Sequence, residues 1–243
     1  MEIKGLKLSV TNCYLVGSGK PYLLVDTGYV EDWDRLCKRL NEAGVGWRDI
    51  EAILLTHHHD DHCGCLQKAL GENPQMRIVL SEQGKRFLST GKNDSTWSRP
   101  INRRVQLFIT LLSLFDQRWR THSFPAYQTR ASDILVSGET HLRDIGIGLD
   151  GRIIETPGHS LDSISVLFED GDCIVGDAAS NFPAFLGTKY CVILIEDLET
   201  YYTSWRKLIS AGARQIFPAH GKPFPVERLE QNLGKNRRAQ MAS

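Results

Sequence analysis

Histidines and aspartates fill residues 57–62, where the chain reads His-His-His-Asp-Asp-His. The run begins just after the apolar residues 52–55, which we expect to form a short buried strand. Imidazole and carboxylate groups hold zinc, manganese or iron at hydrolytic centres. Without a cation, burying so many of these groups together would cost each of them its hydration. The cluster therefore predicts a metal site at a strand end. An exposed loop or a tag-like segment is the alternative, but a tag lies at a terminus.

Three later positions repeat this pattern, in which an apolar strand ends in a side chain that can bind a metal. A single histidine at a strand end is more often structural, and a Gly-Asp pair by itself is weak evidence. Together, however, they place several histidines at strand ends that can converge on one face. The three residues are His159, Asp177 and His220, which follow the segments 152–156, 173–175 and 215–217.

The elements that must position these residues alternate between short strands and amphipathic helices. This order suggests a single domain, 1–243, with two similar α/β halves at about 1–84 and 134–243 and a helical insertion at about 85–133. The expected strands are 3–8, 13–16, 22–25, 52–55, 77–80, 134–136, 145–149, 152–156, 164–168, 173–175 and 215–217. The expected helices are 31–43, 63–70, 82–89, 100–115, 197–211 and 225–236.

The helix expected at 100–115 carries apolar residues on more than one face. A helix of this kind buries several of its faces. It could line a substrate pocket, with Phe108, Leu112 and Phe115 as lining residues, or pack against a second copy in a homodimer. Simple burial within its own subunit is the third interpretation. The segment 124–127, Phe-Pro-Ala-Tyr, is a candidate lid.

Composition indicates a globular protein without a nucleic-acid or membrane partner. Lys+Arg and Asp+Glu both number 29, so the net charge is +0 and offers no electrostatic attraction to nucleic acid. No apolar segment approaches the roughly 20 residues that span a bilayer. The first residues lack the apolar centre of a signal peptide. With the 6 cysteines interpreted as reduced thiols, we expect a cytoplasmic protein.

Across nearly its whole length the chain resembles the metallo-β-lactamase-fold hydrolase superfamily. The His-x-His-x-Asp-His motif of that superfamily is matched in the 57–62 run, and its later histidine, aspartate and histidine motifs follow in the right order. The turn Asp26-Thr27-Gly28 is similar to the first motif of the family. The matching positions are His57, His59, Asp61, His62, His159, Asp177 and His220.

The resemblance implies an α/β (α+β) fold, a four-layer αββα sandwich with a dinuclear metal centre at one edge of its sheets. It assigns one ion to His57, His59 and His159, and a second to Asp61, His62 and His220, with Asp177 bridging them. Two divalent ions are expected, zinc first, with manganese or iron as alternatives.

Neighbouring polar residues are expected to support these ligands. In an extended turn, residues 57, 59 and 61 point one way, which leaves His58 and Asp60 as supporting or solvent-facing groups. Asp26 could orient one of the histidines, or simply form an Asp-x-Gly turn. Where the family often has a second glycine, this chain has Cys65, as a buried inert thiol or as a soft ligand or redox-sensitive group.

These expectations together predict a metal-dependent hydrolase acting on a small-molecule substrate, either an ester, a lactone or a thioester. A hydroxide shared by the two ions would attack the substrate, and Asp61 would carry a proton to the leaving group. The alternatives are a phosphodiesterase that uses the same site, a mononuclear iron oxygenase acting on a sulfur substrate, and a ligand-binding sensor with little turnover.

Overall fold

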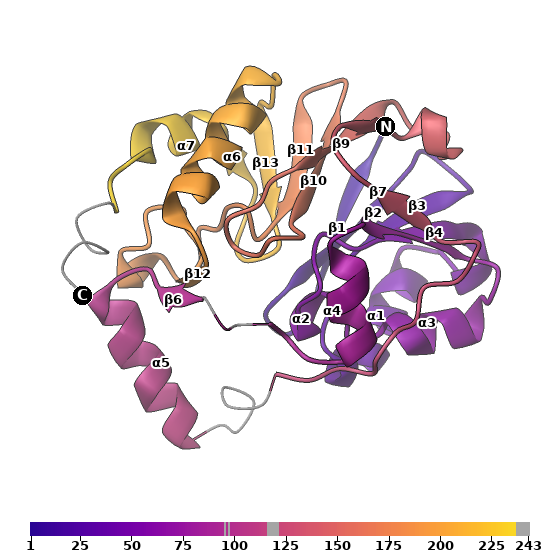
Figure 1. Cartoon of the computed structure of the whole chain (residues 1–243). Helices are drawn as coiled ribbons and strands as arrows, with labels where there is room; N and C mark the ends of the chain where they lie inside the picture. Colours follow the sequence, from indigo (N-terminus) through magenta and orange to yellow (C-terminus); the bar gives the residue numbers. More distant parts are fainter. Residues whose placement is uncertain (95, 97, 116–121, 237–243) are drawn as a thin grey trace.

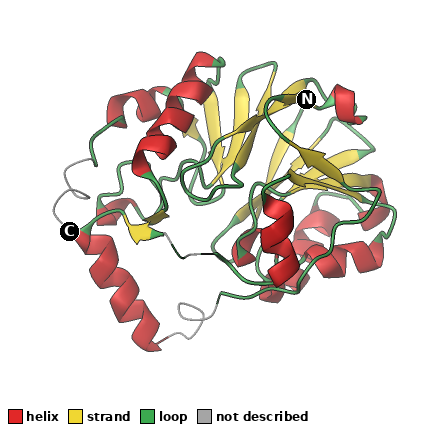
Figure 2. Ribbon diagram, viewed as in Figure 1, coloured by secondary structure: helices red, strands yellow, loops and turns green. Residues whose placement is uncertain are grey.

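The computed structural model describes residues 1–94, 96, 98–115 and 122–236. Two six-stranded sheets pack face to face, and helices cover the outer face of each sheet (Figures 1 and 2). The four layers are those of the αββα sandwich expected from the sequence. Within the described ranges, no helix has the length and apolar character required to cross a membrane.

The N-terminal sheet has the strand order β1-β2-β3-β4-β5-β7. Its last four strands run parallel, and parallel neighbours need crossover connections, which helices on the outer face supply. The strands are β1 (Ile3–Lys7), β2 (Asn12–Val16), β3 (Tyr22–Val25), β4 (Ile50–Leu54), β5 (Arg77–Ser81) and β7 (Ile134–Val136). The crossover helices are α1 (Trp33–Glu42), α2 (Asp60–Cys63), α3 (Leu66–Glu72) and α4 (Gly84–Thr90).

The C-terminal sheet has the order β14-β13-β11-β10-β9-β8 and is mostly antiparallel. Its one parallel pair, β11 with β13, is connected by helix α6, whose first turn is capped by the side chain of Asp197. The strands are β8 (Thr140–His141), β9 (Gly151–Glu155), β10 (Ile164–Phe168), β11 (Asp172–Gly176), β13 (Gln215–Pro218) and β14 (Phe224–Pro225). The helices are α6 (Leu198–Ser210) and α7 (Glu227–Asn232).

Three apolar clusters separate the four layers. Because side chains alternate along a strand, Leu23 and Val25 face the second sheet, whereas Leu24 between them faces the helices. The cluster between the sheets joins residues such as Val79 to Val166 from the opposite half. Trp205 of α6 is fully buried in the third cluster, on the outer face of the C-terminal sheet. The strand ends are therefore held on a rigid support.

The insertion lies between β5 and β7, which are neighbours in the N-terminal sheet. After α4 it forms the short strand β6 (Arg99–Pro100), which pairs with β12 (Leu194–Ile195) of the C-terminal half. Helix α5 (Arg103–Phe115) follows β6 and extends along the side of the molecule (Figure 1).

Several sequence-based expectations for the insertion are wrong. The helix begins at Arg103 instead of residue 100, because Pro100 pairs in β6. It does not bury several faces within the chain, since Leu107, Leu111 and Leu114 are 61%, 49% and 63% exposed. Apolar composition predicts burial only where a partner surface is within reach, and α5 extends beyond the sheets.

Other local expectations also fail. The candidate lid at 124–127 is no lid, because Phe124 and Tyr127 are buried in the cluster beneath the N-terminal helices. A strand does not form at 145–149, because a 3-10 helix, Arg143–Ile145, ends at its first residue and the rest has no strand. The expected helix at 63–70 is divided into α2 and α3 at Gly64-Cys65.

Candidate metal centre

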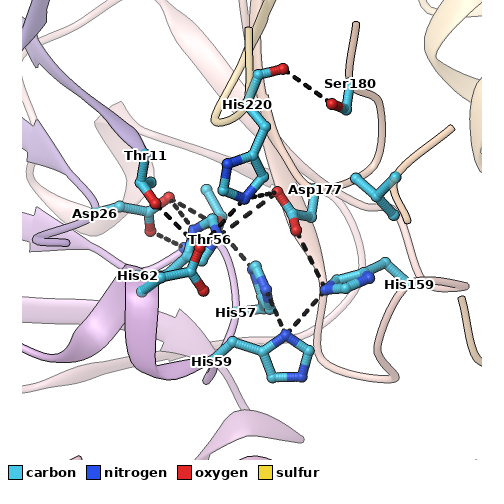
Figure 3. A network of polar contacts seen from close by, with 12 residues as sticks. Thr11, Asp26, Thr56, His57, His59, His62, His159, Asp177, Ser180 and His220 are labelled. Carbon is cyan, nitrogen blue, oxygen red and sulfur yellow. Dashed lines mark hydrogen bonds and ion pairs between the residues drawn. The ribbon is translucent and has the colours of Figure 1, made fainter. Parts of the chain in front are cut away.

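The seven residues that match the family motifs lie together at strand ends of the two sheets, and all of them except Asp61 are labelled in Figure 3. Each follows the end of a strand, and all seven are buried or nearly so. The N-terminal half contributes His57, His59, Asp61 and His62 after β4, and the C-terminal half contributes His159, Asp177 and His220 after β9, β11 and β13.

Three imidazoles form the first group. Nδ1 of His59 lies 3.1 Å from Nε2 of His57 and 2.9 Å from Nε2 of His159. Nitrogens that bind zinc at about 2.0–2.1 Å in a tetrahedron lie about 3.3 Å apart, close to these separations. Burial, reinforced by the neighbouring imidazoles, lowers the pKa of His57 and of His59 well below the usual value. The group is therefore neutral at pH 7, as metal ligation requires.

The second group combines two imidazoles with a carboxylate. Oδ2 of Asp61 lies 3.2 Å from Nε2 of His220 and 3.6 Å from Nε2 of His62. Burial alone would lower the pKa of His62, but the carboxylates around it outweigh burial and raise that pKa to about 9. The pKa of His220 is likewise raised against the effect of burial, chiefly by Asp177. Without a metal, the surrounding carboxylates therefore favour the protonated form of both imidazoles.

Asp177 lies between the two groups. Its Oδ2 is 3.4 Å from Nε2 of His159, and its Oδ1 is 3.2 Å from Nε2 of His220 and 3.6 Å from that of His62. One carboxylate therefore presents one oxygen to each group. His57, His62 and Asp177 form a further group that could hold a metal, and it shares His57 with the first group and His62 with the second. The two sites therefore lie side by side.

The donor atoms fit divalent metal ions. Nε2 of His62 and Oδ1 of Asp177 are buried without a hydrogen bond in the described part of the chain, although both face the centre. Buried polar atoms of native proteins rarely lack a partner, and an ion between the groups would satisfy these two. Nitrogen and carboxylate oxygen are ligands that zinc accepts readily.

Surrounding residues fix the histidines by their second ring nitrogen. Nδ1 of His62 lies 2.8 Å from Oδ2 of Asp26, whose carboxylate also accepts hydrogen bonds from the backbone and side chain of Thr56. Nδ1 of His159 donates to the carbonyl of Leu194 at 2.8 Å, and that of His220 to the carbonyl of Val10 at 3.1 Å. Each contact leaves Nε2 free for a metal.

Only part of this support could be found from the sequence. From the sequence, Asp26 is either an orienting group or a residue of a simple Asp-x-Gly turn, and its contact with His62 supports the orienting group. The carbonyls of Leu194 and Val10 belong to the backbone, so the residue type does not reveal them. The hydroxyl of Thr11 donates to Oδ2 of Asp61 at 3.0 Å, but Thr11 is not part of a recognisable motif.

His58 and Asp60 point away from the centre and connect the motif to distant segments. His58 is 1% exposed, so the solvent-facing alternative is wrong; its Nδ1 lies 2.9 Å from Oδ1 of Asp162, and its Nε2 accepts from the backbone of Asp94. Asp60 exchanges two hydrogen bonds with Asn93. Asp162 and Asn93 were not identified from the sequence.

The thiols near the centre are not part of it. Sγ of Cys65 donates to the carbonyl of Tyr29, and Sγ of Cys63 to that of His58. Burial raises the pKa of Cys65 to about 12, so it remains a protonated thiol. Neither belongs to a group that can hold a metal among the described residues. These contacts favour the interpretation as buried inert cysteines.

The proposed pocket residues of α5 have a different environment from the one expected. Phe108 packs on the C-terminal core, with its ring 6.0 Å from that of Phe185. Leu112 is partly exposed, and the side chain of Phe115 lies outside the described residues. Their contribution to a substrate pocket stays a prediction.

Comparison with known proteins identifies relatives over nearly the whole chain. A family model described as the metallo-beta-lactamase superfamily matches residues 6–220. Beta-lactamase-like protein 2 homolog of Drosophila melanogaster is 27% identical over 97% of this chain and 68% of its own length. Atrochrysone carboxyl ACP thioesterase of Aspergillus fumigatus is 26% identical over 94% of this chain and 55% of its own length. The chain thus spans about half to two thirds of these relatives.

Solved structures show the same fold. An archaeal metallo-beta-lactamase superfamily protein from Sulfolobus tokodaii matches 99% of this chain and 86% of its own, with a TM-score of 0.64 at 19% identity. A metallo-beta-lactamase family protein from Thermus thermophilus matches 99% of this chain and 79% of its own, with a TM-score of 0.66 at 22% identity. At these identities the likeness concerns the fold alone.

Proposed function

The chain belongs to the metallo-beta-lactamase superfamily, and from this membership together with the geometry of the metal centre we propose that it is a hydrolase with two divalent ions. The observation that carries the proposal is the position of Asp177, with one oxygen toward each of two groups of metal-competent side chains. Zinc is the proposed metal, because the first group consists of three buried neutral imidazoles.

Each residue has a defined part in this proposal. His57, His59 and His159 hold one ion; Asp61, His62 and His220 hold the other; and Asp177 contacts both. When bound, such ions supply a hydroxide near neutral pH and polarise the bond under attack. Asp61 is the proposed group to move the proton to the leaving atom, because its side chain belongs to the centre and is 13% exposed.

We propose a small ester, lactone or thioester as the substrate, with the thioester first. The support for a thioester is the relative named as an ACP thioesterase, which matches nearly the whole chain. Hydrolysis would break the carbonyl–sulfur bond, place the oxygen of water on the carbonyl carbon, and release a thiol, a carboxylate and a proton.

The test is metal analysis of the purified protein, followed by rates on thioesters, esters, lactones and a phosphodiester. We expect close to two equivalents of zinc per chain. We also expect turnover of a thioester, an ester or a lactone. Asp177→Asn should lose metal and lower kcat/KM by about 100-fold or more, since it removes a ligand that both ions share. Asp172→Asn, at the opposite end of β11, is the matched control and should change neither.

Three outcomes would replace the proposal. Full metal content and full turnover in Asp177→Asn would exclude the bridging role. One equivalent of iron with oxygen uptake would indicate an oxygenase, and turnover of the phosphodiester alone would indicate a phosphodiesterase.

A further inference from the structure

An open cavity lies at the start of α5, on the C-terminal half of the molecule. It has a volume of about 810 Å³ and is lined by segments around residues 102–104, 186–189 and 234–236. Among the described residues, four lining side chains are basic, namely Arg103, Arg104, Lys189 and Lys235, and none is acidic. Within the described residues, no carboxylate forms an ion pair with any of the four. The cavity is therefore a concentrated positive site in a chain whose net charge is +0.

The two arginines occupy the wrong end of a helix for local stability. The N-terminus of a helix carries a partial positive charge and free N–H groups, so acidic residues are favoured there and basic residues are not. Helix α5 has 13 residues, and its first turn contains Arg103 and Arg104 and no acidic residue. An anion bound in the cavity would compensate both the helix end and the side chains. Local rules are broken in this way mainly at functional sites.

Two asparagines hold the walls of the cavity in place. Nδ2 of Asn102 donates to the carbonyl of Leu186 at 3.1 Å, while its Oδ1 caps the helix by accepting from the backbone of Val105. Asn236 is 4% exposed, and its Nδ2 donates to the carbonyl of Thr188 at 3.0 Å. All three wall segments are thus joined by buried or partly buried hydrogen bonds, which keeps the basic groups together without a ligand.

The wall segments are linked by backbone contacts to residues of the metal centre. Strand β6, just before Arg103, pairs with Leu194, whose carbonyl holds His159. The loop that ends in Lys189 begins at Ser180, whose hydroxyl donates to the carbonyl of His220 at 2.9 Å (Figure 3). Two of the wall segments are therefore connected, through β12 and Ser180, to the backbone that positions His159 and His220.

We propose that this cavity binds the phosphate groups of a phosphorylated pantetheine arm. The arm is part of the thiol that leaves when the thioester substrate is hydrolysed. Arginine and lysine are the usual phosphate-binding side chains, and the helix end adds N–H donors. The shared chemistry allows two sources of the arm, free coenzyme A or a carrier domain. The substrate class rests on the proposed thioester hydrolysis, whereas the phosphate site does not.

Binding is measured first, on the metal-loaded protein, by calorimetric titration with adenosine 3′,5′-bisphosphate, which has no thiol. Arg103→Gln/Arg104→Gln should weaken binding by about tenfold for each arginine, and added salt should weaken binding to the native protein. The matched control Arg48→Gln/Arg206→Gln removes the same charge from exposed positions elsewhere and should bind normally. Equal binding by both double variants would overturn the proposal.

Kinetics then identify the substrate. An acyl-coenzyme A and a carrier-bound thioester are compared, and the source of the arm is the one whose KM the cavity variant raises about tenfold or more with little change in kcat. The corresponding thioester of pantetheine, which lacks phosphate, should be unaffected. Arginine-dependent binding without any thioester turnover would keep the phosphate site and reject the proposed function. Arginine-dependent binding of a single-stranded oligonucleotide, without binding of the bisphosphate, would overturn the proposal in favour of nucleic acid.

Discussion

Asp26 supports the metal centre from a backbone conformation that few residues adopt, with φ at 62°. Its two carboxylate oxygens accept three hydrogen bonds, two from Thr56 and one from Nδ1 of His62. Since the carboxylate only accepts, it keeps the proton of His62 on Nδ1 and leaves Nε2 free for a metal.

Asp26→Asn should therefore weaken metal binding at the site of His62 by about 10–100-fold. Asparagine tolerates positive φ, so the backbone is not strained by this change. Its amide would, however, direct N–H donors toward His62 and the hydroxyl of Thr56, and favour the tautomer that protonates Nε2. Competition with a chromogenic zinc chelator measures the zinc affinity of the native protein and of Asp26→Asn.

A matched carboxylate separates this effect from simple destabilisation. Asp32 is also buried and accepts from the backbone and hydroxyl of Ser9, but it is no part of the metal groups. Asp32→Asn should lower the free energy of unfolding by about 1–3 kcal/mol and leave zinc affinity unchanged. Equal zinc affinity in both variants would refute an orienting role for Asp26.

At the scale of elements, the turn between α2 and α3 depends on one glycine. A Cβ on Gly64 would lie 2.5 Å from the backbone nitrogen of Val30 and 2.6 Å from the carbonyl oxygen of Asp60. Both are backbone atoms, so neither can move away as the end of a side chain can. This close approach packs α2, which carries Asp61 and His62, against the loop that follows β3.

Gly64→Ala should consequently destabilise the protein by about 2–3 kcal/mol, as overpacking of a core does. The conformation of Gly64 is helical, with φ −57° and ψ −38°, so helix propensity alone predicts the opposite sign. Gly71→Ala in α3 is the control, since a Cβ there meets nothing within 4 Å and should stabilise by up to about 1 kcal/mol. Urea unfolding measures the change in the free energy of unfolding for each variant. Equal changes in Gly64→Ala and Gly71→Ala would contradict the clash at Gly64.

The elements that sequence periodicity could locate are those with long apolar patterns or motif ends. The strands before His57, His159 and Asp177 were located because a buried apolar run precedes a polar turn. Strands β6 and β12 cannot be located in this way, since each has only two residues and the two pair although they are far apart in the sequence. A proline at residue 100 suits the first turn of a helix, but the pairing of Pro100 with Leu194 overrides that preference.

At the scale of the whole molecule, the metal centre joins two halves that the sequence could place only by resemblance. Periodicity indicates two strand-rich halves, but no pattern specifies which strand ends meet. The order of the motifs indicates the set of candidate metal ligands. No motif indicates the basic cavity, because Arg103, Lys189 and Lys235 are far apart in the sequence. Ligands from both halves imply that a bound ion stabilises their packing.

This arrangement predicts that zinc raises the thermal stability of the protein, and more so as pH increases from about 6.5 to 9. Binding to the folded state at 100 times Kd contributes about 2.7 kcal/mol, or about 5–10 °C in Tm. The pKa of His62 is raised to about 9, so its proton stabilises the metal-free fold below 6.5 and this contribution is lost as pH rises through 9. Zinc must also displace that proton, which costs less at higher pH.

The lowered pKa values of His57 and His59 leave both side chains neutral across this pH range, so they do not make the zinc effect depend on pH. Thermal unfolding with zinc and with chelator, at several pH values, should show a widening gap that Asp177→Asn largely removes. A gap that narrows with pH would mean that the second group does not bind metal.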